Sequence, residues 1–241
     1  MGQNPSVNGI GALTIFGIAG LPEVRAGDDL ASMIAAGAEL APGDVVVVTQ
    51  KIVSKAEGRV VAVDPEDAEA RRQLAEGEAV RVLRRRGDLV VTETRHGFIC
   101  ANSGVDLSNM ANGYAALLPV DPDRSARRIR DGLRSGTGCD VGVIVSDTFG
   151  RAWRRGVTDV AIGSAGVVPV VDLRGTTDAM GRTLVATEIC VVDEIAGAAE
   201  LVMGKAAAIP VAVVRGVDPS VLGEGSVREH VVRPYGEDLF R

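Results

Sequence analysis

The residues with the clearest chemical potential lie in one stretch, residues 143–156. A short apolar, β-branched run there gives way to Asp147 and Thr148, and three arginines follow: Arg151, Arg154 and Arg155. Carboxylate and hydroxyl oxygens are hard donors that suit Mg²⁺ or Mn²⁺, and guanidinium groups suit phosphate or carboxylate. The pattern predicts a buried strand that ends in a polar loop, where a metal bridges an anion to a carboxylate.

The same residues also fit a purely structural interpretation. Asp147 could cap the N-terminus of a helix, and the arginines could lie on the solvated face of that helix. Trp153 would then anchor the core. A motif this short does not decide between the two interpretations.

A second oxygen-donor segment, residues 102–109, is rich in small polar side chains and holds one carboxylate, Asp106. Ordinary turn chemistry would explain such a composition. Protein-bound Mg²⁺, however, usually has one or two carboxylate ligands, together with substrate phosphate and water. Asp106 is therefore the best candidate for a partner of Asp147.

The hydrophobic pattern predicts the elements that must position these residues. We expect strands at residues 12–18, 45–49, 167–173 and 211–214, and an antiparallel pair formed by 89–92 and 97–101. Helices are expected at residues 28–40, 64–86, 121–133 and 187–204. Residues 50–59 are expected to form a polar loop, and residues 175–183 a loop or hairpin. No linker or change of composition marks a boundary, so residues 1–241 are expected to form one domain.

Composition excludes several classes of protein. Hydrophobic residues make up 46% of the chain but aromatic residues only 3%, so the core must consist mainly of Val, Ala, Leu and Ile. With 26 Lys and Arg against 32 Asp and Glu, the net charge is −6, which argues against a nucleic-acid partner. The apolar runs are too short for a membrane span, and no signal peptide is recognisable. Three scattered cysteines (Cys100, Cys139 and Cys190) fit reduced thiols in a cytoplasmic protein.

Several familiar catalytic motifs are missing from the sequence. It contains no Walker-type loop, no dinucleotide-binding glycine fingerprint and no Gly-x-Ser-x-Gly elbow. His96 and His230 are the only histidines, and we expect both to be structural rather than catalytic. The remaining carboxylates, hydroxyls and cations at strand ends suit metal-assisted phosphoryl chemistry.

Several longer motifs carry a family resemblance, in one order along nearly the whole chain. They are residues 20–23 with 27–30, 43–49, 51–59, 104–109, 146–154 and 210–216. With these motifs the sequence resembles the coenzyme F420-0:L-glutamate ligase (γ-glutamyl ligase) family. The resemblance implies an α+β fold, with mixed sheets and flanking helices, in a homodimer.

The resemblance also implies an activity. Members of the family use GTP and a divalent metal, Mg²⁺ or Mn²⁺, to add L-glutamate to coenzyme F420-0 in coenzyme F420 biosynthesis. The first product is an amide, and a γ-linked glutamate follows. Phosphoryl transfer would convert the lactyl carboxylate of F420-0 to an acyl phosphate, which the glutamate amine then attacks. Whether K⁺ assists is left open.

The resemblance assigns site residues one by one. The metal positions are Asp106, Asp147 and Thr148. The nucleotide positions are Leu21, Pro22, Glu23, Val24, Gln50, Lys51, Lys55, Asn109, Met203, Gly204, Lys205, Ala206, Ala207, Ala208, Ile209 and Pro210. Two of these depart from the family pattern: Gln50 stands where many members carry serine, and Lys205 where some present an uncharged oxygen donor. Lys205 is therefore a doubtful metal ligand, whereas Lys55 is placed to neutralise phosphate charge.

Two alternatives to this activity stay open at this point. The chain could be a GTP-binding sensor or scaffold that keeps the fold without the chemistry, or an amide ligase for another acid. Some actinobacterial relatives carry a flavin-binding reductase domain downstream, so the chain is expected to be a stand-alone ligase or the ligase part of a longer protein. The number of glutamates added and the roles of Arg151 and Arg154 are not determined by the residues.

Overall fold

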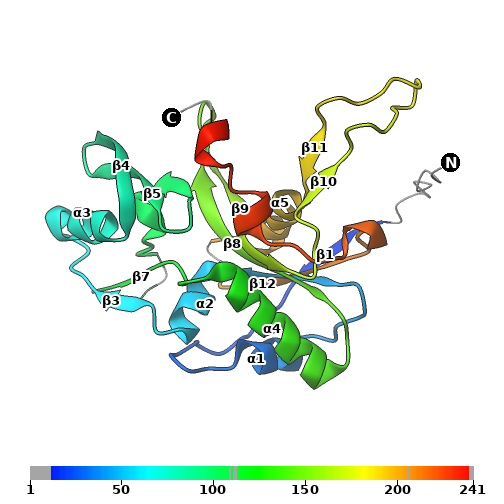
Figure 1. Cartoon of the computed structure of the whole chain (residues 1–241). Coiled ribbons are helices and arrows are strands. Elements are labelled where there is room, and N and C mark those ends of the chain that lie inside the picture. Colours follow the sequence, from blue (N-terminus) through cyan, green and yellow to red (C-terminus); the bar gives the residue numbers. More distant parts are fainter. Residues whose placement is uncertain (1–11, 109, 111–112, 206, 239–241) are drawn as a thin grey trace.

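The centre of the molecule is a five-stranded sheet (Figure 1). The computed structural model describes residues 12–108, 110, 113–205 and 207–238. The strand order is β1 (Thr14–Gly17), β12 (Val211–Arg215), β2 (Val45–Thr49), β8 (Gly142–Gly150) and β9 (Val157–Ala165). β2 and β8 run parallel, and the other neighbours are antiparallel. The strands expected at residues 45–49 and 211–214 are confirmed.

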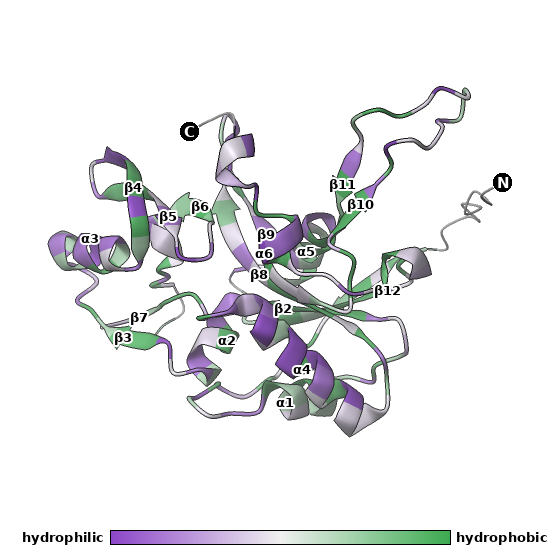
Figure 2. Ribbon diagram, in the orientation of Figure 1, coloured by the Kyte–Doolittle hydropathy of each residue, from purple (hydrophilic) through white to green (hydrophobic). Residues whose placement is uncertain are grey.

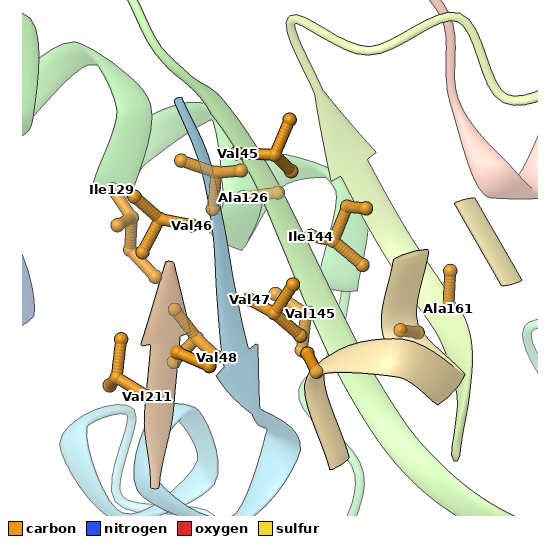
Figure 3. Packing of buried hydrophobic residues seen from close by; sticks show 14 of the residues in the cluster. Val45, Val46, Val47, Val48, Ala126, Ile129, Ile144, Val145, Ala161 and Val211 are labelled. Atoms are coloured by element: carbon orange, nitrogen blue, oxygen red, sulfur yellow. The ribbon is translucent and has the colours of Figure 1, made fainter. Parts of the chain in front are cut away.

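Continuous apolar runs, rich in valine, place β2 and β12 in the interior of this sheet. The four valines of β2 are fully buried, as are Val143, Ile144 and Val145 of β8. Such runs are typical of strands that are covered on both faces. Figure 3 shows the valines of β2 packed against β8, β12 and the helix residues Ala126 and Ile129.

Helices cover both faces of the sheet. α1 (Leu30–Gly37) and α4 (Pro122–Thr137) pack on one face, and α5 (Val191–Met203) packs on the other (Figure 1). Asp121 caps α4 through the Arg124 amide, Pro122 opens it, and Gly138 ends it in a left-handed conformation. The outer side of α4 is mostly hydrophilic (Figure 2). The helix expected at residues 121–133 is confirmed and extends to Thr137.

A smaller region carries the remaining sheets. It contains β3 (Val60–Ala62) paired with β7 (Tyr114–Ala116), and a three-stranded sheet of β4 (Ala79–Arg86), β5 (Leu89–Thr94) and β6 (Ile99–Ala101). α3 (Ala68–Gly77) and the 3₁₀ helix η1 (Asn102–Gly104) lie beside them. The antiparallel pair expected from residues 89–101 is confirmed.

The single helix expected at residues 64–86 is wrong. α3 ends at Gly77, and the arginine-rich segment after it forms the edge strand β4. Glycine is a poor helix residue, and charged side chains suit a strand edge. An ion pair of 2.9 Å between Arg81 and Glu93 links β4 to β5 across the strands.

Two further expectations need correction. Residues 50–59 do not form a loop, because α2 (Gln50–Ala56) begins directly after β2. The helix expected from residue 187 begins only at Val191, because Glu188–Cys190 form strand β11 against β10 (Val170–Asp172). Of the strand expected at residues 167–173, only β10 is extended and paired. The hairpin expected at residues 175–183 is confirmed, and Figure 1 shows it as a projecting arm.

The C-terminal part of the described chain consists of short turns. They are η2 (Pro219–Val221), α6 (Val227–His230) and η3 (Tyr235–Glu237). The three cysteines are free thiols, as expected. Within the described residues, no helix is long and apolar enough to cross a membrane.

Candidate functional site

A cavity of about 290 Å³ lies where β2, β8 and β9 meet α2 and the end of α5. It collects the predicted site residues from five distant parts of the chain. All those that the structure describes line it, with the single exception of Ala207. Asn109 and Ala206 lie outside the described residues. The structure therefore brings these residues together, while the roles assigned to them stay predictions.

Asp147 and Thr148 lie within a strand rather than in a loop, which corrects the first expectation. β8 continues to Gly150 because β9 pairs with it along its whole length. The interpretation of Asp147 as a helix cap is therefore wrong. Trp153 is not a core anchor either, since 89% of it is exposed in the turn between the two strands.

The carboxyl group of Asp147 is held in an unfavourable electrostatic environment. Burial, together with the nearby carboxylates of Asp106 and Asp159, raises its pKa to about 7. The backbone amide of Thr148, which donates to Asp147 Oδ1 at 2.8 Å, and the ammonium of Lys205 act in the opposite direction. A further positive charge in the cavity would stabilise the ionised form.

Asp106 is tied to the start of α2 by Lys51. The Lys51 ammonium lies 3.0 Å from Asp106 Oδ2 and donates to Ser108 Oγ at 2.9 Å. Ser108 in turn donates to Asp106 Oδ1 from both its amide and its hydroxyl. Burial acts to raise the pKa of Asp106, but the bonds from Ser108 and the charge of Lys51 outweigh it and hold that pKa below its usual value.

Lys55 lies one helical turn beyond Lys51 and also faces the cavity. Its ammonium contacts Glu23 Oε1 at 2.6 Å, which joins α2 to the segment 21–24. Glu23 itself is largely exposed. Lys51 and Lys55, both predicted nucleotide-binding residues, are thus on one face of α2, and each is paired with a carboxylate in this structure.

The sequence analysis missed two acids that line the same cavity. Asp159 is buried in β9, opposite Thr148, and accepts hydrogen bonds from Ser146 Oγ and Thr148 Oγ1. Glu200 comes from α5, and burial raises its pKa. For Asp159 the sequence does hold a signal, because it is the only acid in the largely apolar run of residues 157–165. That signal points to the cavity only when the pairing of β8 with β9 is known.

The arginines after β8 do not line this cavity. They lie in the exposed turn of residues 151–156, where the Arg151 guanidinium donates to the Arg155 carbonyl at 3.3 Å. They are not on a helix face. Within the part of the chain that the structure describes, none of the three is within ion-pair distance of a carboxylate.

Comparison with known proteins places this geometry in a family. The family model for F420-0:gamma-glutamyl ligase matches residues 19–216. The chain belongs to that family. Coenzyme F420:L-glutamate ligase of Methanothermobacter thermautotrophicus is 39% identical over 249 residues, covering 95% of this chain and 99% of the relative. The protein of the same name from Methanopyrus kandleri is 44% identical over 91% of this chain and 94% of its own length. The one from Archaeoglobus fulgidus is 39% identical, with 94% and 96% covered.

For this member of the F420-0:gamma-glutamyl ligase family, the mixed sheets and flanking helices confirm the α+β class. Both histidines have structural contacts. His96 Nε2 lies 2.9 Å from the Pro119 carbonyl oxygen, and its ring stacks on Phe98. His230 Nδ1 lies 3.0 Å from the Ser226 carbonyl oxygen.

The donor set fits a hard divalent cation. Among the described residues, no group of three or more His, Cys, Asp and Glu side chains is arranged to hold a metal. The cavity instead offers the carboxylates of Asp106 and Asp147 and the hydroxyl of Thr148. Two carboxylates with an oxygen donor leave room for water and phosphate, which is the usual coordination of protein-bound Mg²⁺. Such an ion would also relieve the repulsion from Asp106 and Asp159 that helps to raise the pKa of Asp147.

Proposed function

We propose that this chain is a GTP-dependent ligase that joins L-glutamate to coenzyme F420-0 in coenzyme F420 biosynthesis. One observation carries the proposal: in a chain of this family, two carboxylates and two lysines from distant segments face one cavity. The relatives named coenzyme F420:L-glutamate ligase are similar over nearly the whole chain. The first bond formed is an amide, and a γ-linked glutamate is added next.

GTP would occupy the cavity with its phosphates toward α2. Lys51 and Lys55 supply positive charge at the wall nearest the carboxylates, and ammonium groups are common phosphate ligands. Gln50 supports a polar ligand. It is 1% exposed, Ser54 donates to its Oε1, and its Nε2 has no hydrogen-bond partner among the described residues. A buried amide nitrogen without a hydrogen-bond partner is unfavourable, so a ligand atom that accepts a hydrogen bond from Gln50 Nε2 would stabilise the site.

The chemistry consists of two balanced steps. A carboxylate oxygen of the F420-0 lactyl group attacks the γ-phosphorus of GTP, the bond to the bridging oxygen breaks, and GDP leaves. The glutamate amine then attacks the carbonyl carbon of the acyl phosphate, so that inorganic phosphate leaves and a proton is released. Lys51 and Lys55 would lower the repulsion between the attacking carboxylate and the phosphates.

Asp106, Asp147 and Thr148 would hold Mg²⁺ or Mn²⁺. The metal would neutralise charge on the phosphate oxygens. The remaining task of these residues is positional, because β8 and the Lys51–Asp106 contact fix the carboxylates against the wall that carries the lysines. We also expect a homodimer in the cytoplasm, and light scattering of the purified chain tests the oligomeric state.

The deciding experiment incubates the purified chain with GTP, Mn²⁺, L-glutamate and F420-0, and follows product masses together with GDP. Glutamate additions matched by GDP release, and lost in Asp147→Ala, are the expected result. Asp88→Ala is the matched control, because it removes an exposed carboxylate in the β4–β5 turn. GTP that binds without turnover would instead favour a sensor or scaffold. GDP release only with other acids would favour a different amide ligase.

A further inference from the structure

Asp159 holds a defined position relative to the proposed metal site. It is 3% exposed and lines the cavity from β9. Its Oδ1 accepts from Thr148 Oγ1 at 2.7 Å, and its Oδ2 accepts from Ser146 Oγ at 2.9 Å. Both hydroxyls come from β8, where Thr148 lies directly opposite Asp159. Each carboxylate oxygen therefore receives one hydroxyl hydrogen.

The direction of these bonds determines what Thr148 can offer to a ligand. A hydroxyl has one hydrogen to donate and two lone pairs, whereas a carboxylate only accepts. Because the hydrogen of Thr148 is donated to Asp159, only lone pairs remain for the cavity. The hydroxyl can then coordinate a cation but cannot donate to a phosphate oxygen.

We infer that Asp159 is a positioning residue, which fixes the Thr148 hydroxyl as a cation ligand instead of a phosphate donor. This inference rests on the proposed function, since it assumes a divalent cation beside Thr148. Outer partners of this kind typically change metal affinity by about 10- to 100-fold when they are lost. Asp159 contributes through Thr148 and does not need to touch the metal.

The competing explanation is that Asp159 only adds negative charge to the cavity. Glu200 provides the matched comparison, because it lines the same cavity and carries the same charge. No hydrogen bond joins Glu200 to Thr148 among the described contacts. Asp159→Asn and Glu200→Gln remove equal charge, but only Asp159→Asn changes the acceptor of the Thr148 hydrogen. The amide that replaces the carboxylate has one acceptor oxygen in place of two, so Ser146 and Thr148 compete for it and the Thr148 hydrogen is no longer fixed on residue 159.

The test measures Mn²⁺ affinity by electron paramagnetic resonance of free Mn²⁺, in the presence of GTP and without F420-0 or glutamate. Asp159→Asn is expected to weaken binding by about 10- to 100-fold, and Glu200→Gln by clearly less. Added to Thr148→Val, Asp159→Asn should cause no more loss than Glu200→Gln does. Added to Thr148→Ser, which keeps the hydroxyl, it should again cause the full loss.

Equal losses for Asp159→Asn and Glu200→Gln, or the same loss in the Thr148→Val background, would overturn the inference. If Asp159→Asn does not fold by circular dichroism, Asp159→Glu replaces it. That variant keeps the charge but displaces the acceptor, so it should weaken binding with Thr148 present and not with Thr148→Val. If the wild-type chain binds no Mn²⁺, the metal site of the proposed function is refuted, whatever the Asp159 variants do. A wild type that binds Mn²⁺ and forms product, with all Asp159 variants unaffected, refutes the positioning role alone.

Discussion

Replacing Asp147 by asparagine should stabilise the metal-free protein while it abolishes ligase activity. Burial and two neighbouring carboxylates raise the pKa of Asp147 from 3.8 to about 7. Between these two values the folded state holds a proton that the unfolded state has lost. The need to ionise Asp147 therefore lowers the free energy of unfolding progressively as the pH rises from about 4 to 7. Above pH 7 the loss is complete. Asparagine has a similar shape and no charge, so it removes this cost.

The magnitude follows from the two pKa values. A tenfold change in proton affinity corresponds to about 1.4 kcal/mol, so the difference between 3.8 and about 7 amounts to about 4 kcal/mol above pH 7. Because Asp147 is partly exposed, solvent reduces this value, and we expect a gain of about 2 kcal/mol at pH 8. At pH 5 the gain should be under half of that, because only part of the range between the two pKa values has been passed.

The assay is urea unfolding followed by circular dichroism, in the presence of EDTA, at pH 5 and pH 8. Asp88→Asn is the control, because it removes an exposed carboxylate far along the chain. Mn²⁺ should then stabilise the wild type more than Asp147→Asn, since only the wild type supplies the second carboxylate. A variant that is less stable than the wild type at pH 8, or a gain that is equal at both pH values, would refute the electrostatic reasoning.

Three further outcomes are expected. Lys51→Met should weaken GTP binding about 10- to 100-fold in calorimetry, because a charge-assisted phosphate contact is lost; unchanged affinity would remove Lys51 from the nucleotide site. Arg151→Ala should leave kcat and GTP affinity nearly unchanged, because Arg151 lies in an exposed turn outside the cavity; a kcat about tenfold lower with intact GTP affinity would show instead that it acts on the transition state. Gly163→Ala should lower the free energy of unfolding by about 2–3 kcal/mol, since its Cβ would lie 2.3 Å from the Pro122 carbonyl carbon. Gly136→Ala, with no atom within 4 Å, should instead raise it by about 0.5–1 kcal/mol.

Local sequence patterns were enough to predict the elements that have a clear hydrophobic run or clear capping residues. The four-valine run of β2 can only be a buried strand, and the cap at Asp121 with Pro122 and Gly138 defines α4. Metal-donor chemistry alone suggested Asp106 as the partner of Asp147, whereas Lys51 was added only by the family resemblance, because nothing in its spacing requires it to share their cavity. The roles assigned to them stay predictions.

Tertiary pairing decided the elements that the sequence analysis placed wrongly. The segment Ala79–Arg86 has the charge pattern of a surface helix, yet pairing with β5 makes it a strand. Asp147 and Thr148 read as loop residues because polar side chains follow an apolar run. They extend β8 only because β9 returns beside it and binds its backbone as far as Gly150. Such pairing is invisible in a window of a few residues.

A single extra residue in β9 explains why Asp159 could not be found from the strand pattern. Gly163 faces α4, so strict alternation would also turn Asp159 toward α4, away from the cavity. The register instead passes from Val145 opposite Gly163 to Ser146 opposite Ala161, which leaves Ile162 as a bulge. The Ala161 amide at this bulge donates to Asp193 Oδ1 at 2.9 Å. The bulge thereby reverses the facing of the residues that precede it in β9, relative to Gly163, and brings Asp159 opposite Thr148, to which it is hydrogen-bonded.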